Sequence, residues 1–370
     1  MSNPLDGLLA GLLKKKSDSV VGLDIGGSFV KAVQLHKKGA KAVLDTYGEV
    51  ALGPLSGLEI GQATNLSTEK LATAILDLFN EAKITSRDVV FSLPLTSTLL
   101  VVIELPDLGE DKLKEMIPIE ARKYIPTSVS EVALDFWIVP RAPQTYVDPD
   151  EEERAKAAGP KVDVLIAAVH KDVLNRYQQI AQKIGATNVS MEIEIFSTIR
   201  SVMGRDSSLT MILDMGAANT KIAMVEDGIV RSSHLINSGS QDITLALSKA
   251  KGVSMLKAEE IKRDFGLAGD PTDPSIAEIT RLAVERIFAE ANRLLTKYQQ
   301  TKHVSVSRVV LTGGGVLLKG LPDLVQSSFS TTVVFGNPFE KVEAPAVLAP
   351  ILKEAGPEFA VALGLAIRKL

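Results

Sequence analysis

Two segments far apart in this sequence carry the same pattern of residues, and the pattern suits phosphate binding. The first runs from Asp24 to Lys31 (DIGGSFVK) and the second from Asp214 to Lys221 (DMGAANTK). Each places an acid, a glycine and a lysine at the same offsets, with a hydroxyl or amide side chain between the glycine and the lysine. Glycine lets the backbone come close to an anion and turn its N–H groups toward it. Two such loops predict a nucleotide held between the two halves of a duplicated protein.

The two aspartates predict a magnesium site between these loops. Asp24 and Asp214 each follow an apolar run that is typical of a strand, so both carboxylates are expected to face a cleft. Mg²⁺ keeps several waters and takes only one or two carboxylates. Ser28, Asn219 and Thr220 add side-chain donors for phosphate. One copy alone would indicate a plain turn, because hairpins need Asp and Gly for geometry alone; the second copy favours the binding site.

Two further segments fit the adenosine part of a nucleotide. A glycine triplet, Gly313 to Gly315, follows the apolar run 309–311 and precedes a predicted helix. Such a loop allows a flat ring or a sugar to approach the backbone. Glu259 and Lys262 lie at i and i+3 on one helical face, where together they could reach a ribose or a base edge. The plain alternatives are a flexible glycine loop and a solvated helix with ordinary ion pairs.

Composition narrows the class of protein. A chain of 370 residues exceeds one typical core, so two or more domains are expected. Its net charge of −4 argues against a nucleic-acid binder. The absence of cysteine excludes disulfides and thiolate metal sites. The four histidines are scattered, which does not suggest a zinc site. No apolar run approaches the ~20 residues that span a bilayer.

The N-terminus combines leucines with lysines. Leu5, Leu8, Leu9, Leu12 and Leu13 fall at helical spacing, and three lysines follow at 14–16. This pattern is expected of an amphipathic helix on a membrane surface. The alternative is a short arm that docks on the body of the protein or on a partner. A signal peptide would need the positive charges on the other side of the apolar stretch.

Apolar periodicity predicts an α/β chain whose second half repeats the first in outline. Pro118 should kink or split one of the predicted helices. Strands are expected near 20–23, 32–35, 42–47, 88–94, 99–105, 131–139, 162–169, 211–213, 222–225, 228–233, 309–311 and 332–335. Helices are expected from 67 onward and near 109–124, 171–184, 240–252, 256–264, 273–302 and 356–367, with a long exposed loop over 141–161.

Two phosphate hairpins and a glycine-rich loop, in this order, resemble the actin-like ATPase superfamily, which includes actin, heat-shock chaperones, sugar kinases and the division protein FtsA. Within it, the chain is most similar to the PilM family of type IV pilus assembly. That narrower resemblance rests on residues 120–126 (EARKYIP), 131–136 (EVALDF), 213–216 (LDMG) and 356–366 (GPEFAVALGLA).

The resemblance implies an α/β, actin-like fold of two duplicated, ribonuclease-H-like domains, with an FtsA-like inserted 1C subdomain. The expected divisions are an arm at 1–19, subdomain 1A at 20–84, 186–207 and 341–370, subdomain 1C at 85–185, subdomain 2A at 208–245 and 303–340, and subdomain 2B at 246–302.

The resemblance also implies ATP and Mg²⁺ as cofactors and gives each motif residue a role. Asp24 and Asp214 would hold the metal. Glu192 would position the attacking water, and Glu194 competes for that role. Phosphates would be bound by Gly26, Gly27, Ser28, Lys31, Gly216, Ala217, Asn219, Thr220 and Lys221; ribose or adenine by Glu259 and Lys262; and adenosine by Gly313, Gly314 and Gly315. Alanines at 217 and 218 leave few side-chain donors, so weak or absent ATPase activity is expected.

The implied function is a cytoplasmic scaffold at the inner face of the membrane. It would recruit the N-terminal peptide of a PilN-like inner-membrane protein, in a groove near residues 93–104 and Tyr124. Other platform proteins or a second copy are further possible partners. An FtsA-like division protein is the alternative, although that class predicts a C-terminal membrane helix and this sequence ends with its last core helix. A sugar kinase would need an aspartate base beside a sugar pocket, which no motif announces.

Overall fold

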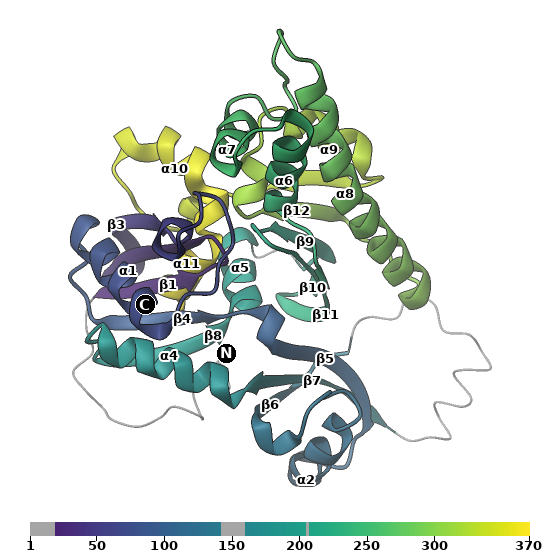
Figure 1. Ribbon diagram of the computed structural model, residues 1–370. Helices are drawn as coiled ribbons and strands as arrows, with labels where there is room; N and C mark the ends of the chain where they lie inside the picture. Colours follow the sequence, from purple (N-terminus) through teal and green to yellow (C-terminus); the bar gives the residue numbers. More distant parts are fainter. Residues whose placement is uncertain (1–18, 142–159, 205–206) are drawn as a thin grey trace.

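The computed structural model describes residues 19–141, 160–204 and 207–370 (Figure 1). Nearly all of the arm expected at 1–19 and most of the loop expected at 141–161 lie outside these residues. Within the described ranges, none of the helices combines the length and the apolar character needed to cross a membrane.

Two five-stranded sheets with the same strand order form the two halves of the protein. The orders are β3-β2-β1-β4-β8 and β11-β10-β9-β12-β13. In each sheet the first three strands along the chain form an antiparallel meander, and the other two run parallel to its first strand. The duplication confirms the predicted actin-like fold. The strands are β1 (Ser19–Ile25), β2 (Phe29–Lys38), β3 (Lys41–Ala51), β4 (Asp88–Leu93) and β8 (Asn188–Ile193), then β9 (Thr210–Met215), β10 (Thr220–Glu226), β11 (Ile229–Ile236), β12 (Arg308–Thr312) and β13 (Thr332–Phe335).

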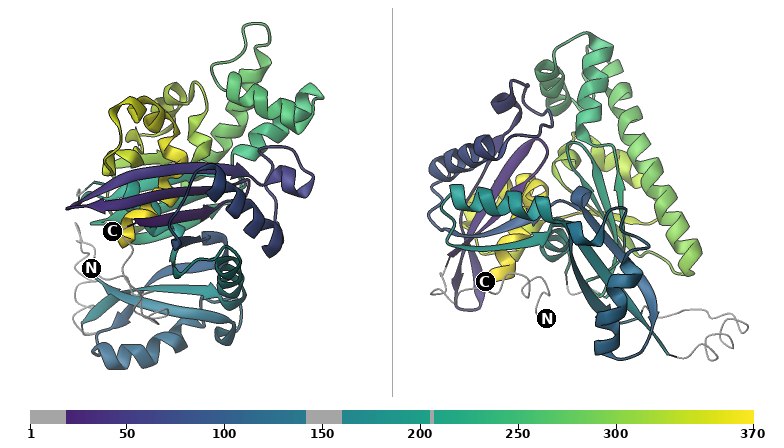
Figure 2. Two further views of the ribbon diagram at one scale, coloured as in Figure 1. Left: turned by 90° about the vertical axis from the view of Figure 1, so that its left-hand side faces the viewer. Right: turned by 60° about the horizontal axis from the view of Figure 1, so that its bottom comes forward.

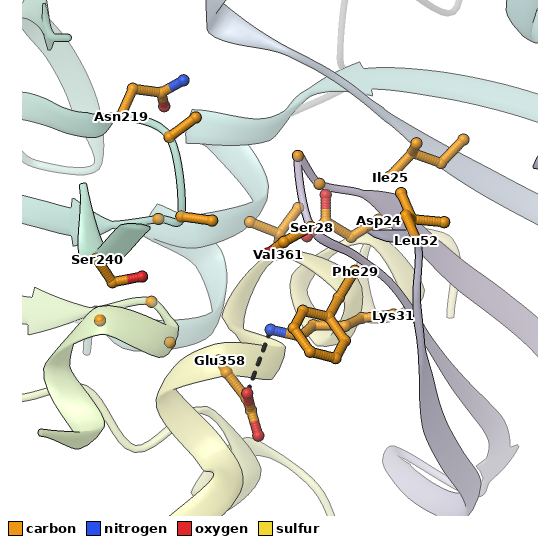
Figure 3. A pocket seen from close by; sticks show the side chains of 18 of the residues that line it. Asp24, Ile25, Ser28, Phe29, Lys31, Leu52, Asn219, Ser240, Glu358 and Val361 are labelled. Atoms are coloured by element: carbon orange, nitrogen blue, oxygen red, sulfur yellow. Dashed lines mark ion pairs between the residues drawn. The ribbon is translucent and has the colours of Figure 1, made fainter. Parts of the chain in front are cut away.

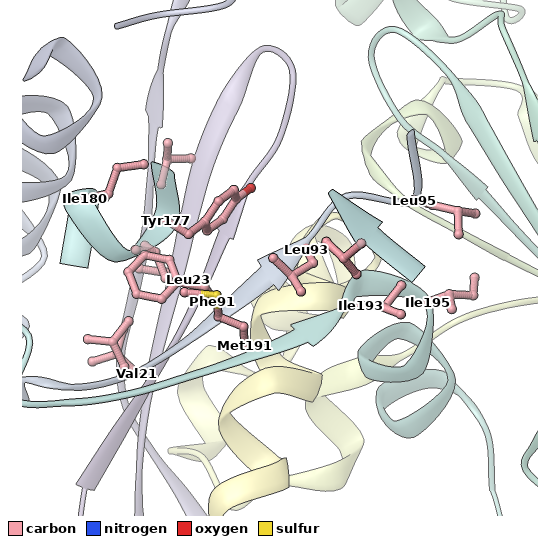
Figure 4. Close-up of a cluster of buried hydrophobic side chains, with 14 of the residues drawn as sticks. Val21, Leu23, Phe91, Leu93, Leu95, Tyr177, Ile180, Met191, Ile193 and Ile195 are labelled. Carbon is pink, nitrogen blue, oxygen red and sulfur yellow. The ribbon is translucent and has the colours of Figure 1, made fainter. Parts of the chain in front are cut away.

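Helices cover both faces of the first sheet because its strands are apolar on both faces. Helices α1 (Thr68–Glu81) and α4 (Lys171–Lys183) pack on the face that carries Val21 and Leu23 (Figure 4). The opposite face, with Val20 and Val90, packs against α11 (Ala360–Lys369). That helix lies so close to β1 that a Cβ on Gly22 would stand 1.9 Å from the carbonyl oxygen of Ala362.

The second half has its own core beneath four helices. These are α6 (Ser240–Lys251), α7 (Met255–Asp264), α8 (Ser275–Lys302) and α9 (Leu321–Ser328). Between the two sheets, α11 also packs against α5 (Glu194–Val202), and α10 (Ala349–Ala355) lies on the outside of the first half (Figure 1). Neither α5 nor α10 is among the helices predicted from periodicity.

A separate three-stranded antiparallel sheet is inserted between β4 and β8, in the order β5-β7-β6. It contains β5 (Thr98–Pro106), β6 (Val132–Val139) and β7 (Lys161–His170), and α2 (Glu110–Ala121) packs on one face. This inserted subdomain lies below the first sheet in Figure 2. Helix α2 continues through Pro118, which removes only one backbone donor. Although β4 and α4 lie within the span 85–185 expected for 1C, both pack with the first sheet.

Candidate nucleotide site

Each predicted phosphate loop is the turn of an antiparallel hairpin. In the first hairpin Asp24 lies opposite Lys31, and in the second Asp214 lies opposite Lys221. In both turns the first glycine donates its N–H to the carbonyl three positions on, at 2.9 and 3.0 Å. The repeat in sequence is therefore also a repeat in backbone geometry. In each copy the aspartate and the lysine are cross-strand neighbours.

The two turns line one cavity of about 540 Å³ between the halves (Figure 3). Most of the predicted site residues lie on its wall. The lining includes Asp24, Gly26, Gly27, Ser28, Lys31, Asp214, Gly216, Ala217, Asn219, Lys221, Glu259, Lys262, Gly313, Gly314 and Gly315. Motifs from four separate parts of the chain thus meet at one place.

Two predicted residues lie outside this lining. The hydroxyl of Thr220 is turned into the protein, where it donates to the carbonyl of Ser238 at 2.8 Å. The carboxylate of Glu192 is fully buried and accepts two hydrogen bonds of 2.7 Å from the Arg200 guanidinium. Its competitor Glu194 does line the cavity, so of the two glutamates the geometry favours Glu194 for any role toward a ligand.

Carboxylates surround the lysine of the second hairpin. The ammonium nitrogen of Lys221 lies 2.8 Å from Glu194 Oε2 and 3.5 Å from Asp214 Oδ2. Burial by itself disfavours the charge on Lys221, but Asp214, Glu194 and Asp24 outweigh it and raise the pKa of the lysine. Burial raises the pKa of Asp24 and of Glu194, against the attraction of the same lysine. Three carboxyl groups thus share the ammonium group of Lys221.

The lysine of the first hairpin has partners that sequence patterns did not indicate. Its ammonium lies 3.3 Å from Glu358 and 3.7 Å from Glu49 (Figure 3 draws the first pair). Burial raises the pKa of Glu49, and Lys31 opposes that effect. Both glutamates line the cavity, and neither belongs to a repeated motif. Each hairpin lysine is thus held by carboxylates that a phosphate could replace.

The glycine triplet touches the second aspartate directly. Gly313 has φ +88°, and a Cβ at this position would stand 2.3 Å from Asp214 Oδ1. A side chain here would strain the backbone and displace the aspartate at once. The triplet is therefore part of the same site as the hairpin, as its sequence setting predicted.

The helical pair predicted from spacing lies on α7. Glu259 binds Lys262 at 2.6 Å and Arg263 at 2.9 Å, and it accepts a hydrogen bond of 2.7 Å from Thr244. Burial disfavours the charge on Glu259, yet these cations and the hydroxyl lower its pKa. Arg263 also lines the cavity and was not predicted. The pairing is internal, so these residues offer a structured polar wall rather than free charges.

A strap between β3 and α1, residues 52–66, contributes Leu52, Gly61, Thr64, Asn65 and Leu66 to the cavity wall. The N–H of Thr64 donates to the carbonyl of Gly27 at 2.9 Å, within the first phosphate loop. The N–H of Ala63 donates to Gln241 on α6 at 2.7 Å, and Glu59 accepts from the N–H of Leu256 on α7 at 2.5 Å. One strap of the first half thereby fastens onto two helices of the second.

The donor set fits a nucleotide phosphate chain with one divalent cation. Two lysines, two glycine turns and the hydroxyl of Ser28 converge from opposite walls. In the described part of the chain, no three acidic or histidine side chains are placed to hold a metal alone. Mg²⁺ does not need such a cage, because it takes one or two carboxylates together with phosphate oxygens and water. Asp24 and Asp214 suit that arrangement.

The family described as "Type IV pilus assembly protein PilM" matches residues 22–370. The chain belongs to this family. A solved structure described as "PilM-PilN type IV pilus biogenesis complex" has 26% identity and a TM-score of 0.78, covering 96% of this chain and 99% of that one.

More distant relatives support the same superfamily. FtsA of Neisseria meningitidis is 23% identical, over 86% of this chain and 83% of its own length. The alignment with FtsA of Streptococcus pneumoniae, at 21% identity, spans 44% of this chain and 40% of that protein. MreB5 of Spiroplasma citri, solved with ADP, has a TM-score of 0.51 at 12% identity, over 95% of this chain and 96% of that one, which shows the shared fold alone. The predicted resemblance is confirmed at the level of family and fold.

Proposed function

We propose that this PilM-family protein binds ATP and Mg²⁺ between its two halves. With the nucleotide bound, it recruits the N-terminal peptide of a PilN-like membrane protein to the type IV pilus assembly platform. The observation that carries the proposal is the convergence of both hairpins, the glycine triplet and α7 on one cavity. The partner is proposed from the similarity to the PilM–PilN complex.

The nucleotide would be divided among the walls of the cavity. The two glycine turns with Ser28, Asn219, Lys31 and Lys221 would hold the phosphates. The α7 wall and the glycine triplet would hold ribose and adenine. Asp24 and Asp214 would take the metal, which neutralises phosphate charge when it is bound.

The strap gives this binding a structural consequence. Because residues 52–66 fasten the first half to α6 and α7 above the cavity, a bound nucleotide would be enclosed by contacts from both halves. A nucleotide enclosed in this way would dissociate slowly and exchange slowly with nucleotide in solution. Alanines at 217 and 218 add no side-chain donors, which agrees with slow hydrolysis or none. The protein would then act as a nucleotide-stabilised scaffold at the inner face of the cytoplasmic membrane.

The test is to purify the protein without added nucleotide, denature it, and identify what is released. Intact ATP near one per chain supports the nucleotide-stabilised scaffold; ADP would indicate turnover, and an empty site that also fails to bind added ATP would refute the proposal. Recruitment is tested by fluorescence anisotropy with a labelled N-terminal PilN peptide, using a peptide of scrambled sequence as the control. Equal affinity for both peptides would refute the partner.

A further inference from the structure

The chain leaves the first sheet for the inserted subdomain at the end of β4, beside the end of β8 and the start of α5. It comes back to the first sheet through α4, which follows β7 directly, and β8 then runs parallel to β4 with Leu93 opposite Ile193. A short 3₁₀ turn, residues 95–97, connects β4 to β5, and α5 begins directly after β8 with Glu194. Figure 4 shows Leu93, Leu95, Ile193 and Ile195 gathered at this junction.

Carboxylates of the nucleotide cavity hold this junction. Glu194 Oε1 accepts a hydrogen bond of 2.7 Å from the N–H of Leu95, the first residue of the exit turn. The other oxygen of the same carboxylate binds Lys221 of the second hairpin at 2.8 Å. Glu194 is 5% exposed, so water does not replace either partner. One side chain thus joins the exit turn, the start of α5 and the lysine of the second hairpin.

A parallel link runs from the first hairpin. Ser92, the penultimate residue of β4, donates to Asp24 Oδ1 at 2.7 Å and accepts from the N–H of Ile25 at 3.3 Å. The exit turn itself reaches the cavity, whose wall includes Pro94, Thr96 and Ser97. The carboxylates of Asp24 and Glu194 therefore both bind the segment where the chain enters the inserted subdomain, at Ser92 and at Leu95.

We propose that Glu194 is a positioning residue that couples occupancy of the nucleotide site to the orientation of the inserted subdomain. A phosphate placed between the hairpins competes for Lys221. The carboxylate of Glu194 then keeps the Leu95 N–H as its remaining partner. The exit turn, and with it the orientation of the inserted sheet, therefore changes when the ligand binds. The inference rests on the proposed nucleotide binding, and it gives the partner peptide a way to sense the nucleotide. By linkage, the peptide and the nucleotide would change each other's affinity by the same factor.

Two substitutions separate coupling from simple structural support. Glu194→Gln keeps an oxygen for Leu95 N–H but removes the charge that binds Lys221. A merely structural role at the exit turn would therefore be rescued by glutamine, whereas coupling would not. Glu192→Gln is the comparison variant, because Glu192 is a buried carboxylate two residues away that pairs with Arg200 and does not line the cavity.

The experiment is hydrogen–deuterium exchange of the full chain with and without Mg²⁺·AMPPNP, with nucleotide binding measured separately by calorimetry. In the wild-type protein and in Glu192→Gln, nucleotide should change exchange in residues 95–106 by about fivefold or more. In Glu194→Gln, nucleotide should still bind, but exchange in these residues should no longer respond to it.

Two results would overturn the inference. One is nucleotide binding to the wild-type protein without any change in residues 95–106, and the other is an equal change in Glu194→Gln. If the wild-type protein fails to bind nucleotide at all, the proposed function itself fails, and the coupling inference falls with it. If Glu194→Gln does not fold, Glu194→Asp is used, since its shorter side chain cannot keep both contacts; an unaltered nucleotide response in that variant also overturns the inference.

Discussion

Replacing Lys221 with methionine should destabilise the protein strongly, and more so at high pH. Lys221 is the cation shared by Glu194, Asp214 and Asp24, at 2.8 and 3.5 Å from the first two. Removing one partner of a buried pair leaves an uncompensated charge and costs roughly 3–5 kcal/mol. Methionine preserves most of the side-chain volume, so the loss would come from charge rather than from a cavity.

The pH dependence follows from the direction of the carboxylate pKa shifts. Burial already raises the pKa of Asp24 and Glu194, and loss of Lys221 removes the attraction that opposes it. The folded variant then binds protons more tightly than the unfolded chain, so its stability falls as pH rises from the ordinary carboxylate pKa through the raised one. The lysine's own raised pKa keeps it charged in the wild-type protein throughout the range from pH 5 to pH 8.

The assay is urea unfolding of both proteins at pH 5 and pH 8. The deficit of Lys221→Met should be about 3–5 kcal/mol at pH 8 and distinctly smaller at pH 5. Lys31→Met is the matched control from the first hairpin. Its partners Glu49 and Glu358 are 30% and 21% exposed, so roughly 1 kcal/mol is expected. A deficit for Lys221→Met that is equal at both pH values would refute the reasoning.

Three further predictions concern the site. Asp24→Ala should weaken Mg²⁺·ATP binding at least tenfold and weaken the PilN peptide indirectly; calorimetry showing unchanged ATP affinity would contradict the site assignment. Gly313→Ala should lose nucleotide binding by displacing Asp214 and cost about 1–3 kcal/mol through strain at positive φ, checked by thermal melting and calorimetry; wild-type values in both would disprove the contact. Glu192→Gln should destabilise the fold by roughly 3–5 kcal/mol yet leave nucleotide affinity unchanged, and a loss of affinity measured by calorimetry would place Glu192 in the site after all.

The sequence allowed the hairpins to be predicted because their chemistry is local. The acid, the glycine and the lysine lie within one hairpin, and the second copy of the pattern favours a phosphate-binding loop over a plain turn. Thr220 could have been excluded by the same local reasoning. Successive strand residues point to opposite faces, so Thr220 cannot face the cavity beside Lys221. The structure places it against the carbonyl of Ser238 instead.

Other parts of the site depend on packing between distant segments, which no spacing encodes. Glu358 reaches Lys31 only because α11 brings the end of the chain onto the first strand. The choice between Glu192 and Glu194 depends on how α5 turns Arg200 back onto the end of β8. The sequence did not predict the contacts of the strap for the same reason, because its partners on α6 and α7 lie in the other half of the protein.

The packing of α11 on β1 has a consequence for the order of events during synthesis. The residues of the second core all lie between 209 and 335, so it can form as soon as that stretch has been made. One face of the first sheet instead needs α11, which is translated only after the whole of the second half. On the ribosome the first sheet must therefore wait with one apolar face uncovered until α11 has been made.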